Sequence, residues 1–91
     1  MGTHTPVQRL AYLGGWQHIY RFTNGYGASV IDHQFSYGRE LAVIRFGSED
    51  LDDFGLVYDT PVTDDVIGHL DDDRLADVLD EIAGLPNPAL R

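Results

Sequence analysis

The 91-residue chain contains no cysteine and no lysine, and none of its apolar runs is long enough to cross a membrane as a helix. The lack of cysteine excludes disulfide scaffolds, thiol catalysis, thiolate zinc sites and iron–sulfur clusters in this chain. Its six basic residues, all arginine, stand against 15 acidic ones, a formal net charge of −9. Apolar residues make up 43% of the chain, which predicts a folded domain rather than a disordered acidic tail. At this length we expect one domain over residues 1–91.

The negative charge is concentrated in the second half of the chain. Residues 1–48 have a balance of +2, and residues 49–91 have a balance of −11. Nucleic acids and anionic membranes are bound through many Lys and Arg side chains, so neither is expected as a direct partner. The expected partner is a basic protein, and a homodimer is kept as an alternative. Residues 1–6 lack the features of a signal peptide, so a cytoplasmic location is expected, with residues 1–4 loose.

A short helix is expected over residues 5–13, near the start of the chain. Thr5 is a suitable N-cap, and Pro6 suits the first helical position. Gly14 follows directly, as glycine does at the end of many helices. These signals predict one short amphipathic helix.

Residues 16–59 are expected to form a four-stranded antiparallel β-meander. Trp16 to Thr23 alternates between two sets of side chains, which is the period of a strand. Asn24-Gly25 follows, and this pair is typical of a two-residue hairpin turn. Strands joined by short turns pair with their neighbours in sequence.

Helices are expected over residues 63–84, where the apolar period changes to 3.6. Thr63 is expected to cap a first helix that ends at Leu70, and Asp71 a second helix over residues 72–83. The fold class is thus α+β in two layers: a four-stranded antiparallel β-meander with C-terminal helices packed on one face. The expected core residues are Trp16, Tyr20, Phe22, Val43, Phe46, Leu56, Val66, Leu70, Leu75, Val78 and Ile82.

Several segments carry a family resemblance: Asn24–Ile31, Phe35–Gly38, Glu40–Ile44 and Tyr58–Gly68. Together they resemble a family of small uncharacterised proteins of actinobacterial bacteriophages and prophages. The resemblance implies a small accessory protein in the cytoplasm of the host cell. It implies no active site, so no residue role is carried over from it.

The acidic residues of the second predicted helix recur along one side of it. Asp73 and Asp77 lie one turn apart, with Asp80 or Glu81 on the next turn, opposite the apolar stripe. Carboxylates about 6 Å apart along a helix can imitate a nucleic-acid backbone. This predicts binding in the basic groove of a host protein and its inhibition; the alternative is an ordinary solvated face. The loop residues expected to extend the row are Glu49, Asp50, Asp52 and Asp53.

Two turn tyrosines suggest a second contact patch. Tyr26 is expected at the tip of the first hairpin and Tyr37 in the next turn, with Arg39 nearby. Tyr and Arg are favoured in the energetic centres of protein interfaces. The alternative is that Tyr37 packs over the sheet edge.

His18 and His33 are the weak candidates for a metal site. With a two-residue turn at Asn24-Gly25, His18 opposes Ile31, and His33 is its diagonal neighbour on the same face. The alternative is two half-exposed strand histidines. The acidic loop does not match a calcium-binding EF-hand, because Phe54 and Pro61 occupy two positions that need oxygen ligands.

No catalytic constellation or phosphate-binding loop is present in the sequence, so we expect a non-enzymatic protein without a cofactor. Its expected action is protein–protein binding, directed at a host protein. One alternative is a structural or self-associating phage component whose sheet edges pair between chains. Another is a small metal-dependent domain built on His18 and His33.

Overall fold

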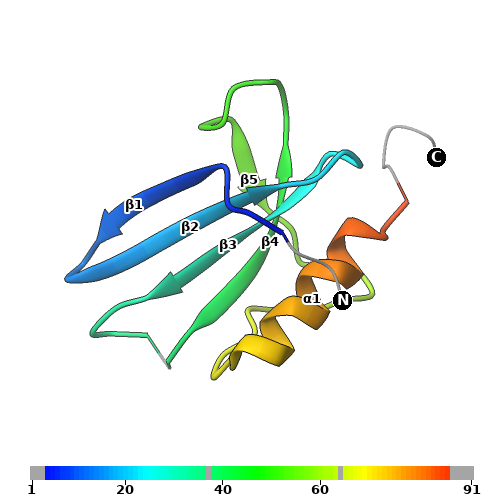
Figure 1. The fold of residues 1–91 in the computed structure, drawn as a ribbon. Helices are drawn as coiled ribbons and strands as arrows, with labels where there is room; N and C mark the ends of the chain where they lie inside the picture. Colours follow the sequence, from blue (N-terminus) through cyan, green and yellow to red (C-terminus); the bar gives the residue numbers. More distant parts are fainter. Residues whose placement is uncertain (1–3, 37, 64, 87–91) are drawn as a thin grey trace.

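The computed structural model describes residues 4–36, 38–63 and 65–86. It contains a five-stranded antiparallel sheet in the order β1-β2-β3-β4-β5, with one helix, α1, against it (Figure 1). The α+β class and the meander topology are as expected, but the sheet has one strand more than predicted. The elements are β1 (Gln8–Tyr12), β2 (Gly15–Arg21), β3 (Tyr26–Asp32), β4 (Glu40–Phe46), β5 (Phe54–Leu56) and α1 (Asp72–Ala83).

The additional strand is β1, where the sequence suggested a helix over residues 5–13. That prediction is wrong, because β1 pairs along its whole length with β2, from Gln8 opposite Ile19 to Tyr12 opposite Gly15. The link is a two-residue turn in which Leu13 and Gly14 have positive φ angles of 48° and 81°. Two positive φ angles match the turn to the twist of a hairpin. The glycine interpreted as a helix end is therefore a hairpin residue.

The β2–β3 hairpin has a three-residue loop instead of the expected two-residue turn. Gly25 N donates to Phe22 O at 3.3 Å, Phe22 N donates to Tyr26 O at 2.9 Å, and Gly25 has a φ of 88°. A turn closed by a glycine of positive φ is a common three-residue hairpin. It moves the register by one residue, so that His18 faces Val30 rather than Ile31.

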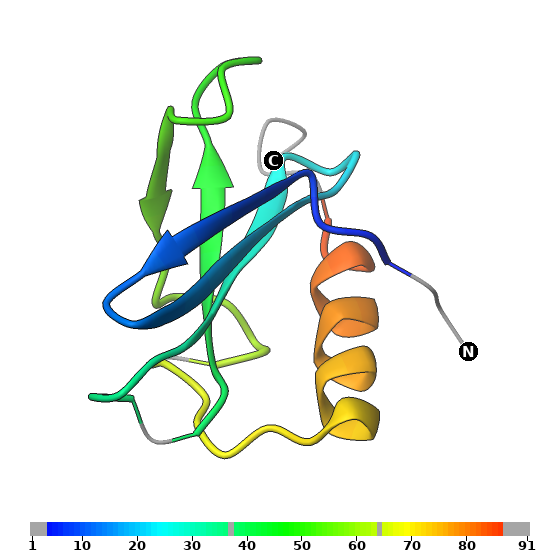
Figure 2. The ribbon, with the colours of Figure 1, turned by 60° about the vertical axis from the view of Figure 1, so that its left-hand side comes forward.

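The register divides the sheet into two faces (Figure 2). The covered face packs against α1, and one of its rows is Tyr20, Ala28 and Val43. No helix of the described residues covers the open face, where the neighbouring row is Ile19, Ser29 and Ala42.

The main core lies between the covered face and α1. Six of the predicted core residues are buried there or in the smaller cluster on the open face: Tyr20, Val43, Phe46, Leu70, Val78 and Ile82. Trp16, Phe22 and Leu75 are partly buried against the main core. Leu56 and Val66 are 55% and 43% exposed, so their prediction as core is wrong. The core residues that were not predicted are Ile19, Tyr26, Ala28, Val30, Leu41, Ile44 and Leu79.

The described residues of the predicted first helix, 63 and 65–70, form no helix. Instead Ile67 and Leu41 exchange two backbone hydrogen bonds of 2.8 and 2.9 Å, which places this segment along the edge of β4. Thr63 Oγ1 bonds the backbone of Asp65, two residues on, and so closes a local turn rather than capping a helix. A helix this short is marginal alone, and the edge of β4 offers its backbone better partners.

Helix α1 follows the expected bounds. The Asp71 carboxylate accepts a hydrogen bond from Arg74 N at 2.7 Å, which confirms it as the N-cap. At the other end, Asn24 Nδ2 in the β2–β3 hairpin donates to three carbonyl oxygens, those of Ile82, Ala83 and Leu85. Side chains thus form hydrogen bonds with backbone groups at both ends of α1. In the described part of the chain no helix is long and apolar enough to span a membrane.

Candidate binding surfaces

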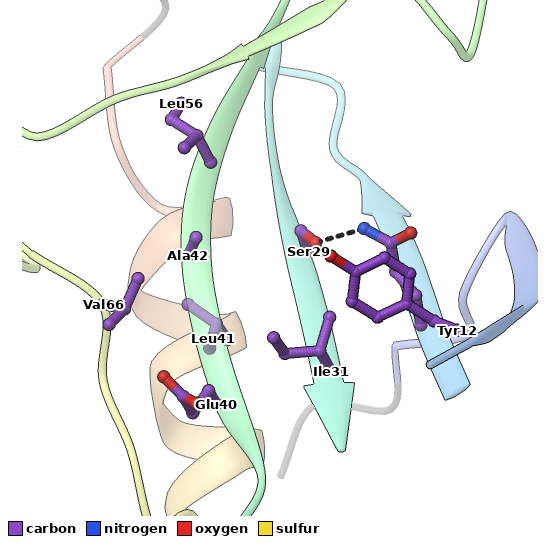
Figure 3. Close-up of a pocket in the computed structure, with 9 residues that line it drawn as sticks. Tyr12, Ser29, Ile31, Glu40, Leu41, Ala42, Leu56 and Val66 are labelled. Carbon is purple, nitrogen blue, oxygen red and sulfur yellow. Dashed lines mark hydrogen bonds between the residues drawn. The ribbon is translucent and has the colours of Figure 1, made fainter. Parts of the chain in front are cut away.

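The open face of the sheet contains a hollow of about 230 Å³ (Figure 3). Its floor and walls come from all five strands and from the segment beside β4. Tyr12 forms one side, and Leu56 and Val66 stand on the other. The residues that line it are Tyr12, Gln17, Ser29, Ile31, Glu40, Leu41, Ala42, Leu56 and Val66.

A hydrogen-bonded polar pair lies in this mostly apolar hollow. Gln17 Nε2 donates to Ser29 Oγ at 2.8 Å. Ser29 is only 8% exposed and is the one buried polar residue in the part of the chain that the structure describes. A buried polar group is retained at low cost only when it is hydrogen-bonded. The pair thus gives the hollow a fixed polar floor.

One charged side chain reaches the hollow. Glu40 faces Ile31 across the β3–β4 pairing, and Ile31 faces Gln17 across the β2–β3 pairing. Among the nine lining residues, Glu40 is the only one with a carboxylate side chain, and none is Lys, Arg or His. The hollow therefore combines apolar walls with one negative charge.

The acidic β4–β5 loop bends over the same face. Leu51 and Phe54 pack against the cluster of Ile19, Ile44 and Phe46, which belongs to the open face. Arg21, also on this face, donates to the Ser48 and Glu49 carbonyl oxygens at 2.6 and 3.0 Å. The carboxylate-bearing residues Glu49, Asp50, Asp52 and Asp53 are exposed at the end of the sheet.

The acidic row on α1 lies on the other side of the molecule. Asp73, Asp77, Asp80 and Glu81 are exposed, while Val78, Leu79 and Ile82 of the same helix are buried. His4 Nε2 is 2.7 Å from Asp80 Oδ1, and Arg74 is 3.9 Å from Glu81. Within the described ranges, Asp73 and Asp77 take part in no ion pair.

The acidic loop and the acidic helix row are therefore two surfaces, not one. The helix row points away from the covered face, whereas Leu51 anchors the loop on the open face. The expectation that the loop carboxylates extend the helix row is wrong in this geometry. The acidic loop, unlike the acidic row on α1, lies on the same face as an apolar hollow.

The two histidines do not meet. His18 faces Val30 on the covered face, where its ring stacks on Trp16 at 4.2 Å between centroids. His33 follows the end of β3, and its ring contacts those of Tyr12 and Phe35. The three-residue hairpin loop separated them, so the expected pairing is wrong. No group of three or more His, Asp or Glu residues suited to a metal ion occurs in the described residues.

His18 has a perturbed acid–base equilibrium. Burial lowers the pKa of its imidazole below the ordinary value of 6.5, and the positive charge of Arg9 on β1 lowers the pKa further. Arg9 and His18 face each other in the β1–β2 pairing. The lowered pKa of His18 is therefore explained by its place in the sheet, partly buried and opposite Arg9.

The tyrosine patch does not form as expected. Tyr26 is 5% exposed and belongs to the main core, so it offers no contact surface. Its burial follows from the changed register, which turns it toward α1. Arg39 is used in an ion pair of 2.8 Å with Asp72. Tyr37 lies outside the described residues.

The sequence does not predict the hollow, for two reasons. It predicts a helix at Tyr12, and it predicts a register between β2 and β3 that differs by one residue from the observed one. A usable signal is the mixed alternation of Gln17, Ile19 and Arg21, because a face that holds both polar and apolar residues is not sealed by a second layer.

Comparisons with protein-family models, with curated proteins and with solved structures found no match to this chain. The likeness to phage accessory proteins therefore stays a prediction. The function is inferred from the residues of the chain itself.

Proposed function

We propose that this protein is a non-enzymatic domain that binds a basic protein partner through the open face of its sheet. The observation that carries the proposal is the hollow between Tyr12 and Leu56, with exposed apolar side chains on its rim and the acidic β4–β5 loop on the same face. Contiguous exposed apolar surface marks interaction sites in folded proteins. Negative charge beside it selects a positive partner and accelerates encounter.

The kind of partner follows from charge. The chain has a net charge of −9, and the loop carboxylates Glu49, Asp50, Asp52 and Asp53 are exposed. A nucleic-acid-handling protein of the host, with a basic surface of its own, is the sharpest form of the proposal. In that form binding would inhibit the partner by occupying its basic surface.

The acidic row on α1 is a second candidate surface. Asp73 and Asp77 are exposed, lie one turn apart and, among the described residues, take part in no ion pair. If this row imitates a nucleic-acid backbone, reversing Asp73, Asp77 and Asp80 to Lys abolishes partner binding and leaves the fold intact. The open face is preferred because it adds apolar contact area to charge.

The test uses a matched pair of variants. Val66 lines the hollow and is 43% exposed, whereas Val7 does not line it and is 46% exposed. Val66→Arg and Val7→Arg therefore make the same chemical change, with the same net charge, at sites of similar exposure. Tagged wild type, both variants and the triple α1 variant are used to capture proteins from a nuclease-treated actinobacterial lysate at low and moderate salt.

The expected result is one basic protein that is captured by wild type and by Val7→Arg and is released as salt rises. Val66→Arg should capture at most about a tenth as much, a loss of roughly 1.4 kcal/mol in binding. Loss of capture in the triple α1 variant alone would contradict the proposal and favour the helix row. Recovery of the bait alone would also contradict it, and sedimentation would then test for self-association.

A further inference from the structure

We propose that Asn24 is a deamidation site that α1 protects in the folded chain, and that its reaction releases the C-terminal end of α1. The inference goes beyond the proposed function, because it concerns the covered face and requires no partner. Three observations support it: the residue that follows Asn24, the hydrogen bonds of the Asn24 side chain and the open surroundings of Gly25.

Asn24 is followed by Gly25, and asparagine deamidates most readily before glycine. Glycine has no Cβ, so its backbone nitrogen approaches the preceding side chain without steric hindrance. The other asparagine of the chain, Asn87, precedes Pro88. Proline has no backbone N–H, so the same ring closure does not occur there. The sequence thus contains one reactive asparagine and an internal control.

The reaction consumes only water. The backbone nitrogen of Gly25 bonds to Cγ of Asn24 while the bond from Cγ to Nδ2 breaks. The side-chain nitrogen leaves as ammonia and takes the amide proton of Gly25 with it. Water then opens the five-membered succinimide ring at one of its two carbonyl carbons. The product is isoaspartate or aspartate at position 24, and either one adds a negative charge.

In the folded chain the reacting groups are all held in hydrogen bonds. Asn24 Nδ2 donates to three carbonyl oxygens at the end of α1, at 2.8 to 3.2 Å, and Oδ1 accepts from Tyr26 N at 3.0 Å. The amide of Gly25 donates to Phe22 O at 3.3 Å. The attack on Cγ requires the Asn24 side chain to turn toward Gly25 N, which breaks these bonds. Deamidation therefore follows a local opening of the contact with α1.

The turn itself is accessible once the contact opens. A Cβ built at Gly25 would have no heavy atom within 4 Å, apart from those of its two chain neighbours, so water reaches this side of the turn. After the reaction the contact does not close again as before, because a carboxylate has no N–H to donate. It would also place a negative charge at the negative end of the helix dipole. The end of α1 is therefore released irreversibly.

The first experiment compares deamidation of the full chain in native buffer and in urea. Samples are digested at intervals, and peptide mass spectrometry quantifies isoaspartate and aspartate at positions 24 and 87. We expect Asn24 to react in the unfolded chain and at least about tenfold more slowly in the folded chain, with no detectable reaction at Asn87. Equal rates in the two states, or no reaction of Asn24 in urea, would overturn the inference.

Two core variants test whether α1 is the protecting element. Ile82→Ala and Ile19→Ala truncate the same side chain at sites that are 0% and 1% exposed. Ile82 lies near the end of α1, whereas Ile19 belongs to the cluster on the open face. Compared at equal free energies of unfolding, Ile82→Ala should deamidate at Asn24 at least about threefold faster than Ile19→Ala. Equal rates would show that global unfolding controls the reaction, and would overturn the role of α1. Leu85→Ala, at a partly buried site, replaces Ile82→Ala if the latter does not fold.

The last experiment examines the product. Anion exchange separates the deamidated chain, and hydrogen exchange is compared with that of the unmodified chain. The Leu85 amide, which donates to Ile82 O at 3.1 Å, should exchange at least about tenfold faster after deamidation, while the amides of β1 and β2 stay unchanged. Asn24→Asp is the reference for the aspartate product and should show the same change. Unchanged exchange at the end of α1 would contradict the release of the helix.

Discussion

The two faces of one sheet differ in what they are made of and in what covers them. The row of Tyr20, Ala28 and Val43 on the covered face is buried and packs against α1. The open face holds the Gln17–Ser29 pair and a hollow whose rim includes exposed Leu56 and Val66. The apolar side chains of the covered face thus form the stable core. The mixed polar and apolar side chains of the open face form a surface that remains accessible.

The difference also separates the two acidic surfaces. The carboxylates of α1 lie on the solvent side of the helix that closes the core. The β4–β5 loop is anchored on the open face by Leu51 and by the hydrogen bonds from Arg21. Charge density alone therefore does not distinguish them. The apolar surface beside the loop does.

The largest expected effect on stability is that of a Leu→Ala substitution in the core, which is compared with the same substitution on the open face. Leu79 on α1 is 3% exposed, and Leu56 on the hollow is 55% exposed. Leu79→Ala should lower the free energy of unfolding by about 2–5 kcal/mol, because it leaves a cavity in the core. Leu56→Ala should change it by less than about 0.5 kcal/mol, as at other exposed sites. Urea denaturation measures both, and equal losses would break the comparison.

Asn24 tests how α1 is held on the covered face. Its Nδ2 donates to the carbonyl oxygens of Ile82, Ala83 and Leu85, and its Oδ1 accepts from Tyr26 N at 3.0 Å. Asn24→Ala should cost about 1–3 kcal/mol, because partly buried carbonyl groups lose their donor.

Asn24→Asp separates the two halves of this contact. It keeps the acceptor for Tyr26 N but loses the donor and places a negative charge at the C-terminus of α1. We expect it to be at least as destabilising as Asn24→Ala. Gln34→Ala, at an exposed residue between β3 and β4, is the control and should be neutral. Wild-type stability in both Asn24 variants would show that this contact does not hold the helix.

Asp71 tests how the other end of α1, its N-terminus, is stabilised. Asp71→Ala should cost about 1 kcal/mol, because Arg74 N loses its acceptor. Asp71→Asn keeps a capping oxygen and should stay near wild type. Thermal unfolding measures both variants. A large loss with Asn, or none with Ala, would contradict the assignment of the cap.

The smallest effect is a pH dependence from His18 at the margin of the covered face. Burial, and then the charge of Arg9, lower its pKa below the unfolded value of 6.5. The unfolded chain therefore binds a proton more readily, so this contribution to stability is present above pH 6.5 and is lost as the pH falls toward the folded-state pKa.

Two variants check the origin of this pH dependence. His18→Gln should lose less stability than wild type between neutral pH and mild acid. Arg9→Gln should move the His18 pKa part of the way back, because burial remains. Histidine resonances followed by NMR report the pKa directly, and a value above 6.5 in the folded chain would reverse the predicted sign.

The C-terminal helix could be predicted from sequence because its signals are local. Asp71 caps it, the stripe of Val78 and Ile82 is buried, and the helix ends at Ala83 before Gly84, all within the segment itself. A short-range code of this kind requires no knowledge of the rest of the fold.

The strand at the start of the chain and the hollow could not be predicted in this way. Thr5, Pro6 and Gly14 satisfy helix rules, but pairing with β2 decides the outcome. In the β2–β3 hairpin, the side chain of Asn24 bonds to α1, far away in sequence, and the observed loop has three residues. Because a shift of one residue changes which side chains share a face, the hollow depends on the length of this loop.

The account is tested most directly by mapping the captured partner onto the ¹⁵N-labelled chain by NMR. We predict shifts or line broadening at Leu10, Tyr12, Gln17 and Leu56, on or beside the hollow, with little change along α1. Changes confined to Asp73, Asp77 and Asp80, with the hollow unaffected, would contradict the assignment of the open face as the binding surface.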